Sequence, residues 1–446
     1  MKKIAQSIKN SPLLLNTMKM SASNIVMFLL PVVVTPILSR LYQPSDFGEW
    51  GVFSSFVTIL GIAIFVGYEN TIIKATEDEV PYVSALCFML GVLVSTATFF
   101  VFAWGRSRGL VFFDQFSSVG LLLAYLLAYA AHTVASNLCN RYGQYTHLAL
   151  ENVVLGGSQA ALRMFFGVVA VSAFNGLILG TTIAQLVTFL FLLICLVRTG
   201  KACSLWAFNI RRIRAIVSRY RNFALYDAPS SLLCYAGFSV PLLVLVGYFD
   251  KSTIGCYSII LQLLLLPMTL VGSAIGRVYY EQLCTNRGQL EHRQRCTQQV
   301  GKVVALIAFV PMLVLACGGD KLVVMFLGSK WGTAGNIALC LAFWSFPTIL
   351  TQPLIPLFRF LNRQRVLFAY NLAYSLVAIG SIILGCKLSH NLYHILTVYA
   401  VTCSMVNLAM YFHLLHMSGT GITPFRQYMP LWAVSAAILA IRIALL

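Results

Sequence analysis

A row of polar and small side chains lies within one apolar stretch of the sequence and includes an arginine. Its members recur at spacings of three or four residues: Asn152, Gly156, Gln159, Arg163 and Gly167. Residues spaced in this way share one face of a helix. A charge within a membrane span is costly and faces other helices or water, and a guanidinium matches the geometry of phosphate groups. We therefore predict that Arg163 holds an anionic phosphate or pyrophosphate and that Gln159 also binds the substrate. The alternative is that Arg163 pairs with an internal carboxylate.

Three further titratable residues lie within or at the edge of apolar stretches. Glu69 could neutralise the arginine or bind a coupling proton. Asp227 could act in the same way, or accept hydrogen bonds from the neighbouring basic segment at the membrane surface. His132 shares a helix face with Tyr125 and Tyr129, and it is either a proton site or a hydrogen-bonded structural histidine. The two tyrosine rings are candidates for stacking on sugars.

The elements that position these residues follow from the composition. Hydrophobic residues make up 59% of the 446 residues, charged residues 10%, and the mean hydropathy is +0.83. Soluble domains carry about 25% charged residues. Several apolar runs reach the roughly 20 residues that a helix needs to cross the hydrocarbon core. They do not alternate as barrel strands do, so we predict an all-α polytopic membrane protein.

Twelve spans are expected, six in each half of the chain. They cover 20–41, 47–74, 81–104, 115–140, 150–174, 176–198, 223–249, 253–280, 300–318, 336–359, 365–386 and 392–416. This gives an N-terminal lobe at 1–198, a connector at 199–222, a C-terminal lobe at 223–416 and a tail at 417–446. The apolar run 430–446 is either a short thirteenth span or an interfacial helix.

The formal charge of +18 reflects membrane orientation rather than nucleic-acid binding. With the N-terminus in the cytoplasm, most Lys and Arg residues fall on the cytoplasmic side, as the positive-inside rule requires. Within the connector, five apolar residues recur at helical spacing: Trp206, Ile210, Ile213, Ile216 and Val217. They lie opposite Arg211, Arg212, Arg214 and Arg221. We predict an amphipathic helix on the inner surface that meets anionic phospholipid. A solvated basic linker is the alternative.

Signatures of metal sites, disulfide frameworks and enzymes are missing from the sequence. The 12 cysteines are scattered through apolar runs without ligand spacing. No phosphate-binding loop, His-Glu-x-x-His or Gly-x-Ser-x-Gly motif occurs. We therefore expect no enzyme, no metal and no cofactor, and uphill transport would depend on an ion gradient or the membrane potential.

A short polar stretch recurs halfway along the chain. YQPSDFGEW at 42–50 and FDKSTIGCY at 249–257 align on Gly48 and Gly255, with an aromatic residue six positions before and two after each glycine. Each stretch separates two apolar runs and carries residues that stop or start helices. We interpret the chain as one six-helix bundle made twice, which is a transporter architecture with parallel repeats.

These motifs resemble those of bacterial polysaccharide (O-antigen type) flippases. The first half carries Ser39-Arg40-Leu41-Tyr42-x-Pro44-x-Asp46-Phe47-Gly48, followed by Tyr68-Glu69. The second half carries Pro229-Ser230-Ser231-Leu232-Leu233, Pro241, Gly255-x-Tyr257, Leu266-Pro267 and Gly272-x-Ala274-Ile275. The family belongs to the multidrug/oligosaccharidyl-lipid/polysaccharide exporter superfamily, and the resemblance covers nearly the whole chain.

The resemblance implies a V-shaped pair of lobes in the inner membrane that moves undecaprenyl-pyrophosphate-linked oligosaccharide to the periplasmic leaflet. Other membrane proteins of glycan assembly are expected partners. Arg40 and Glu69 match the family pattern, whereas Gly67 and Gln262 stand where the family often has basic residues. Because neither residue carries a positive charge, Arg163 is the candidate substitute for headgroup binding.

We expect the headgroup and sugars to occupy a wet cavity between the lobes, with Arg163, Arg40 and Arg141 holding the anion. Three other functions remain as alternatives. A cation or drug antiporter of the same superfamily would want an acidic cavity. A membrane glycan polymerase, ligase or glycosyltransferase would usually need a larger outside loop. A structural membrane protein is the third.

Overall fold

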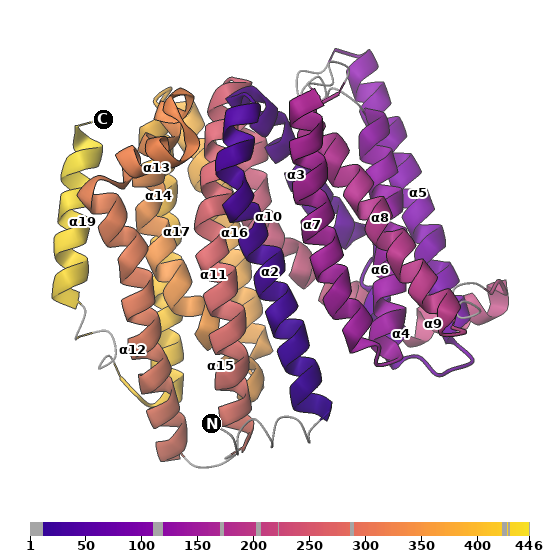
Figure 1. Cartoon of the computed structure of the whole chain (residues 1–446). Coiled ribbons are helices and arrows are strands. Elements are labelled where there is room, and N and C mark those ends of the chain that lie inside the picture. Colours follow the sequence, from indigo (N-terminus) through magenta and orange to yellow (C-terminus); the bar gives the residue numbers. More distant parts are fainter. Residues whose placement is uncertain are drawn as a thin grey trace. The chain divides into compact units, whose positions relative to one another are not determined.

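The predicted all-helical membrane architecture is present in the structure. The computed structural model describes residues 12–109, 119–169, 174–201, 207–221, 223–285, 290–421, 426 and 429–445. Regular structure within these ranges is helical (Figure 1). Eleven helices in this part of the chain are long and apolar enough to cross a membrane. The expected count of twelve is not confirmed. The predicted span 223–249 contains the short helix Phe223–Asp227 followed by the helix Ala228–Leu245.

The chain divides into two compact units, each described here by itself. The first comprises residues up to Tyr42 together with Val52–Tyr235, and the second comprises Gln43–Gly51 together with Ala236–Leu446. The helices up to residue 245 are, in chain order, α2 (Pro12–Leu41), α3 (Pro44–Phe65), η1 (Tyr68–Asn70), α4 (Thr71–Lys74), α5 (Val80–Ser107), α6 (Val119–Arg141), α7 (Tyr145–Val169), α8 (Gly176–Arg198), α9 (Ile210–Arg219), η3 (Phe223–Asp227) and α10 (Ala228–Leu245).

Helix α7 occupies a central place in the first unit. It packs along α2 on one side and along α8 on the other, and α8 in turn packs against α6. Small residues permit the close approach: a Cβ on Gly156 would lie 3.4 Å from the Met27 Cα, and one on Gly180 would lie 2.9 Å from the Arg163 backbone nitrogen. Asn152 donates to Ser23 at 3.1 Å and to Asn24 at 2.8 Å, which adds a polar contact between α7 and α2.

The second predicted span ends earlier than its apolar pattern indicates. Helix α3 stops at Phe65, and the next two residues, Val66 and Gly67, have φ values of 52° and 83°. Left-handed backbone conformations of this kind end a helix. Glu69, predicted within the span, therefore lies in the short 3-10 helix η1 beyond that break.

The amphipathic connector forms helix α9. Its first turn is capped by Asn209, whose side-chain oxygen accepts from the backbone of Arg211 at 3.1 Å. Ile213 and Ile216 are buried, as the helical spacing predicts, and α9 packs against α5. These two residues of the predicted apolar face are therefore covered within the first unit, whereas Ile210 of the same face is 65% exposed and Trp206 lies outside the described residues.

The second unit is built around one almost completely buried helix. Its elements are α11 (Lys251–Thr285), α12 (Leu290–Val314), η4 (Leu315–Gly319), α13 (Asp320–Leu327), η5 (Ser329–Trp331), α14 (Gly332–Thr351), η6 (Gln352–Leu354), α15 (Pro356–Phe360), α16 (Gln364–Leu388), α17 (Leu392–Ser418) and α19 (Met429–Ala444). Helix α14 packs against α11, α12, α13 and α17. Within Ser329–Phe360, the stretch that contains α14, 89% of the most apolar membrane-spanning segment is buried.

The C-terminal apolar run forms α19, which packs along α14 and the turn η4. Gly318, with φ 125°, kinks the chain inside η4. Arg442 donates to the carbonyl oxygens of Leu315 and Ala316 at 3.1 and 3.3 Å and to Asp320 at 2.6 Å. The arginine that interrupts this run thus satisfies backbone acceptors at the kink.

Candidate substrate-binding site

Arg163 lies buried at the contact between α7 and α8, with 8% of its surface exposed. Its Nε and Nη2 donate to the Thr181 hydroxyl at 3.1 and 2.8 Å. The Thr181 hydroxyl in turn donates a hydrogen bond to the Leu177 carbonyl oxygen at 2.6 Å. The Thr181 hydroxyl therefore fixes the orientation of the buried guanidinium.

Tyr42, from the polar stretch that recurs in the sequence, also contacts this place. Its hydroxyl donates to the Arg163 carbonyl oxygen at 2.7 Å. Its ring covers two glycines, Gly167 and Gly176, where an added Cβ would meet ring atoms. Gly167 belongs to the predicted small-residue face, and its role here is to admit the tyrosine. The end of α2 is thereby fixed to α7 beside the arginine.

The two tyrosines predicted to stack on sugars lie together on α6. Their ring centroids are 6.2 Å apart and the planes differ by 14°. Phe53 packs edge-on against Tyr125 at 5.3 Å. The Tyr125 hydroxyl is within electrostatic range of the Arg163 guanidinium. The first unit therefore gathers a cation and stacked aromatic rings, and Gln159 is half-buried on the same helix as the arginine.

The remaining predicted arginines have local contacts. Arg40 is exposed at the end of α2 and donates to the Pro36 carbonyl oxygen at 2.9 Å. Arg141 donates to the carbonyl oxygens of Ile72 and Ile73 at 2.9 and 3.2 Å and pairs with Glu77 at 3.2 Å. Arg141 thus binds backbone carbonyl oxygens of α4 and a carboxylate of the acidic turn that follows. A substrate role for these two arginines stays a prediction.

The two predicted carboxylates, Glu69 and Asp227, lie in the short helices η1 and η3. Glu69 lies near Tyr129 and Cys87, with both of which it interacts electrostatically. Asp227 is the last residue of η3, and its side chain lies outside the described residues. Their predicted coupling roles are not tested.

His132 pairs instead with a carboxylate that the sequence analysis did not single out. Its Nε2 lies 2.7 Å from Glu151 Oε1, and Ser136 donates to Oε2 at 3.0 Å. Both members of the pair are buried, at 9% and 7% exposure. The histidine and serine are four residues apart on α6, which is itself a signal for a shared polar partner on a neighbouring helix.

The described ranges contain no group of three or more His, Cys, Asp or Glu side chains that could hold a metal ion. Among these described residues, the first unit contains the buried Arg163, the His132–Glu151 pair and the Tyr125–Tyr129 stack. Such an arrangement can orient an anionic ligand and stack on a sugar ring.

Comparison with solved structures places the fold among membrane transporters. The chain matches an inward closed conformation of the lipid II flippase MurJ with a TM-score of 0.71 and 12% identity, over 96% of this chain and 97% of that one. It matches an inward-facing multidrug resistance MATE transporter of the MOP superfamily with a TM-score of 0.63 and 12% identity, over 89% and 95%. These similarities confirm the predicted fold class.

Residues 37–336 match the family described as polysaccharide biosynthesis protein. The chain belongs to this family. It is 23% identical over 366 residues to the succinoglycan biosynthesis transport protein ExoT of Rhizobium meliloti (strain 1021), which covers 80% of this chain and 71% of the relative. The protein is thus a multi-pass membrane protein of the polysaccharide biosynthesis family. Its fold is that of the flippase and the MATE transporter, and the relatives it resembles are transport proteins rather than enzymes.

Proposed function

We propose that this transporter moves an undecaprenyl-pyrophosphate-linked oligosaccharide from the cytoplasmic to the periplasmic leaflet of the bacterial inner membrane by alternating access, with its N-terminus in the cytoplasm. Membership of the polysaccharide biosynthesis family supports a glycan cargo. The similarity to a lipid II flippase supports a lipid-linked one. The observation that carries the proposal is the buried Arg163, oriented by Thr181 beside the tyrosine pair.

The physical task is to move a pyrophosphate through hydrocarbon, where an isolated anion costs at least several kcal/mol. A guanidinium presents its donors in a fixed fork that matches phosphate oxygens. Thr181 holds that fork in one orientation. We propose that Arg163 binds the pyrophosphate and that Gln159 donates to a sugar hydroxyl.

The tyrosine stack would bind the glycan. Aromatic rings offer apolar faces together with a polar hydroxyl, which suits the mixed surface of a sugar. Tyr125 and Tyr129 lie nearly parallel on consecutive turns of α6. Stacking of this kind tolerates different sugars, so the two residues would provide affinity without fixing the glycan.

The buried pair of His132 and Glu151 is the proposed coupling site. A histidine beside a carboxylate in a low-dielectric place responds to protonation, because one added proton changes the pair's net charge. The pair lies on α6 and α7, the helices that also carry the tyrosines and the arginine. Proton binding could therefore change how these two helices pack.

We also propose that the exposed Arg211 and Arg214 of α9 contact anionic phospholipid at the cytoplasmic surface. Other membrane proteins of glycan assembly are the proposed protein partners.

The proposed function can be tested by measuring on which side of the membrane lipid-linked units accumulate. A strain without the endogenous gene would carry Arg163→Ala, Arg163→Lys or, as the control, Arg295→Ala, which removes an exposed arginine paired with Glu291. At matched protein levels, lipid-linked units in Arg163→Ala cells should accumulate where a membrane-impermeant reagent added to spheroplasts cannot reach them. Arg163→Lys should transport partially because it keeps the charge and loses the fork. Full surface display by Arg163→Ala would remove this residue from the mechanism.

The same strains separate the rival functions. A polymerase or ligase defect would still place single units on the outer face, whereas a flippase defect traps them inside. A drug or cation antiporter, which the MATE-like fold keeps as the second candidate, would change drug susceptibility and leave the lipid-linked pool normal.

A further inference from the structure

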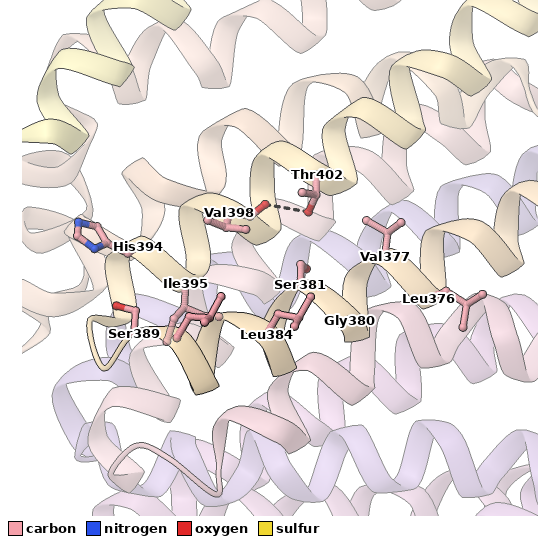
Figure 2. A pocket seen from close by; sticks show the side chains of 12 residues that line it. Leu376, Val377, Gly380, Ser381, Leu384, Ser389, His394, Ile395, Val398 and Thr402 are labelled. Carbon is pink, nitrogen blue, oxygen red and sulfur yellow. Dashed lines mark hydrogen bonds between the residues drawn. The ribbon is translucent and has the colours of Figure 1, made fainter.

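An apolar groove runs along the outside of the second unit between α16 and α17. Its volume is about 580 Å³, and Figure 2 shows its lining. Leu376, Gly380 and Leu384 contribute from α16, and Ile395, Val398 and Thr402 contribute from α17. Leu376 and Leu384 are 64% and 60% exposed. In a membrane protein such a surface is covered by lipid.

Two glycines on α16 shape this groove. A Cβ added to Gly385 would lie 3.0 Å from Ile395, so the two helices are in contact there. A Cβ added to Gly380 would meet no atom within 4 Å. The helix pair is therefore tight next to the turn that joins it and hollow one to two turns further along. A hollow of fixed shape holds a chain better than a flat lipid-facing helix does, because packing supplies the attraction between apolar groups in lipid.

The end of the groove next to the turn is polar. Ser389 and His394 line it, and Lys387 and His390 are exposed beside it. No acidic residue follows Asp320 in the sequence, so no carboxylate from this hairpin opposes these groups. An apolar channel that ends at basic and polar side chains matches a lipid whose phosphate lies at the membrane surface and whose chain runs inward.

We propose that the α16–α17 groove is a binding site for one acyl chain of an anionic glycerophospholipid, with its phosphate held at the Lys387–His394 end. The site is separate from transport of the cargo, and the proposal does not depend on the proposed function. The isoprenoid tail of a cargo lipid is disfavoured as the occupant, because the groove holds only a short length of chain. The arginine and stacked tyrosines suited to a sugar pyrophosphate also belong to the other unit.

Photocrosslinking tests the proposed site. The full-length protein would be reconstituted in vesicles of phosphatidylethanolamine with a small fraction of phosphatidylglycerol carrying a diazirine in one acyl chain. Labelling should concentrate on peptides from 376–402 and exceed that of α5, where Val92, Leu93 and Phe100 are exposed apolar residues. Unlabelled phosphatidylglycerol should compete better than phosphatidylethanolamine. Equal labelling of both regions would overturn the proposal.

Two variants make the test specific. Gly380→Leu fills the hollow and should abolish the excess labelling of 376–402, whereas Gly157→Leu, at a helical glycine with equally open surroundings on α7, should not. Lys387→Gln changes an exposed residue and should reduce the preference for phosphatidylglycerol about fivefold, equivalent to about 1 kcal/mol. Unchanged labelling in Gly380→Leu, or stronger competition by a polyprenyl phosphate than by phosphatidylglycerol, would refute the proposed occupant.

Discussion

Gly48 and Gly255, the two glycines on which the recurring polar stretches align, face each other in the second unit. A Cβ on Gly255 would lie 2.9 Å from the Gly48 nitrogen and overlap the Pro44 carbonyl oxygen; one on Gly48 would overlap the Lys251 carbonyl oxygen. Ser258 closes the contact by donating to the Phe47 carbonyl oxygen at 2.9 Å. The first turns of α3 and α11 thus contact each other backbone to backbone. The two recurring polar stretches provide the two sides of this contact.

Adding a methyl group at this crossing should destabilise the protein. Gly48→Ala and Gly255→Ala force a Cβ against backbone oxygen atoms that belong to helices and cannot rotate away. Overpacking of this kind costs about 1–3 kcal/mol. Thermal unfolding of the purified protein should show a lower midpoint for both variants.

The matched control is Gly332→Ala, at the start of α14 in the same unit, where an added Cβ meets nothing within 4 Å. It should unfold at the wild-type temperature. Wild-type stability in Gly48→Ala would mean that the two helices do not cross this closely.

The hydroxyl of Thr181 should matter for transport because it orients Arg163. Thr181→Val keeps the shape and removes the acceptor, which leaves two guanidinium donors without their hydroxyl partner. Loss of a hydrogen bond to a buried charged group costs about 1.5–3 kcal/mol. The flipping of lipid-linked units, measured by their accessibility in spheroplasts, should fall toward that of Arg163→Lys.

The neighbouring Thr182 provides the control. It is similarly buried, but its hydroxyl donates a hydrogen bond to the Ile178 carbonyl oxygen of its own helix. Thr182→Val should therefore transport normally. Equal defects in the two variants would indicate damage to α8 rather than loss of orientation at the arginine.

Sequence reasoning found the helices and the face that carries Arg163, because apolar length and helical spacing are local properties. It did not find Thr181, since a threonine in an apolar run gives no sign of which neighbour it contacts. Glu151 was missed for a different reason: the predicted span began at 150, whereas α7 begins at Tyr145 and so places this carboxylate more than a turn inside the helix. Periodicity does not fix where a helix starts when the flanking residues are also helix-compatible.

The break after α3 was likewise only partly predictable from the sequence. Gly67 is a recognisable helix stop, yet Val66 also adopts a positive φ. A β-branched residue in that conformation is rare and is imposed by its surroundings. The contact of Gly48 with Gly255 was equally beyond the sequence, because similarity between two turns does not tell whether they touch.

Removing the carboxylate from the buried pair should alter the pH dependence of transport. Glu151→Gln keeps the volume and leaves His132 without its charged partner. If the pair binds the coupling proton, the wild-type rate should change with pH and the variant should be slow and nearly insensitive to pH. Removing one member of a buried polar pair also costs about 1–3 kcal/mol of stability, so the purified variant's unfolding temperature should be measured alongside.

The exposed Glu291, which pairs with Arg295 four residues along α12, supplies the control for that measurement. Glu291→Gln should keep the wild-type rate and pH profile. A Glu151→Gln protein that folds and retains the wild-type pH profile would exclude the pair from coupling.

The acidic turn before α5 should fix the connector helix in a pH-dependent way. Glu79 accepts from Arg219 at 2.6 Å, from the Tyr220 hydroxyl at 3.1 Å and from the Thr76 backbone at 3.2 Å. Burial raises the pKa of Glu79, but these hydrogen bonds and the charge of Arg219 outweigh it and leave the pKa below its usual value. The carboxylate is therefore favoured in the folded protein, and its contribution to stability is present above the unfolded-state pKa and lost as pH falls through the folded-state pKa.

Glu79→Gln should accordingly lower the unfolding temperature at neutral pH by a small amount, because a largely exposed ion pair contributes at most about 1 kcal/mol. The difference from wild type should shrink as the pH falls below 4.5, the usual value for this carboxyl. Thermal unfolding of both proteins across this range measures it. Asp78→Asn, in the same turn, controls for loss of a surface charge and should show no such trend. A constant difference between wild type and Glu79→Gln at every pH would mean that the carboxylate's ionisation does not hold α9 in place.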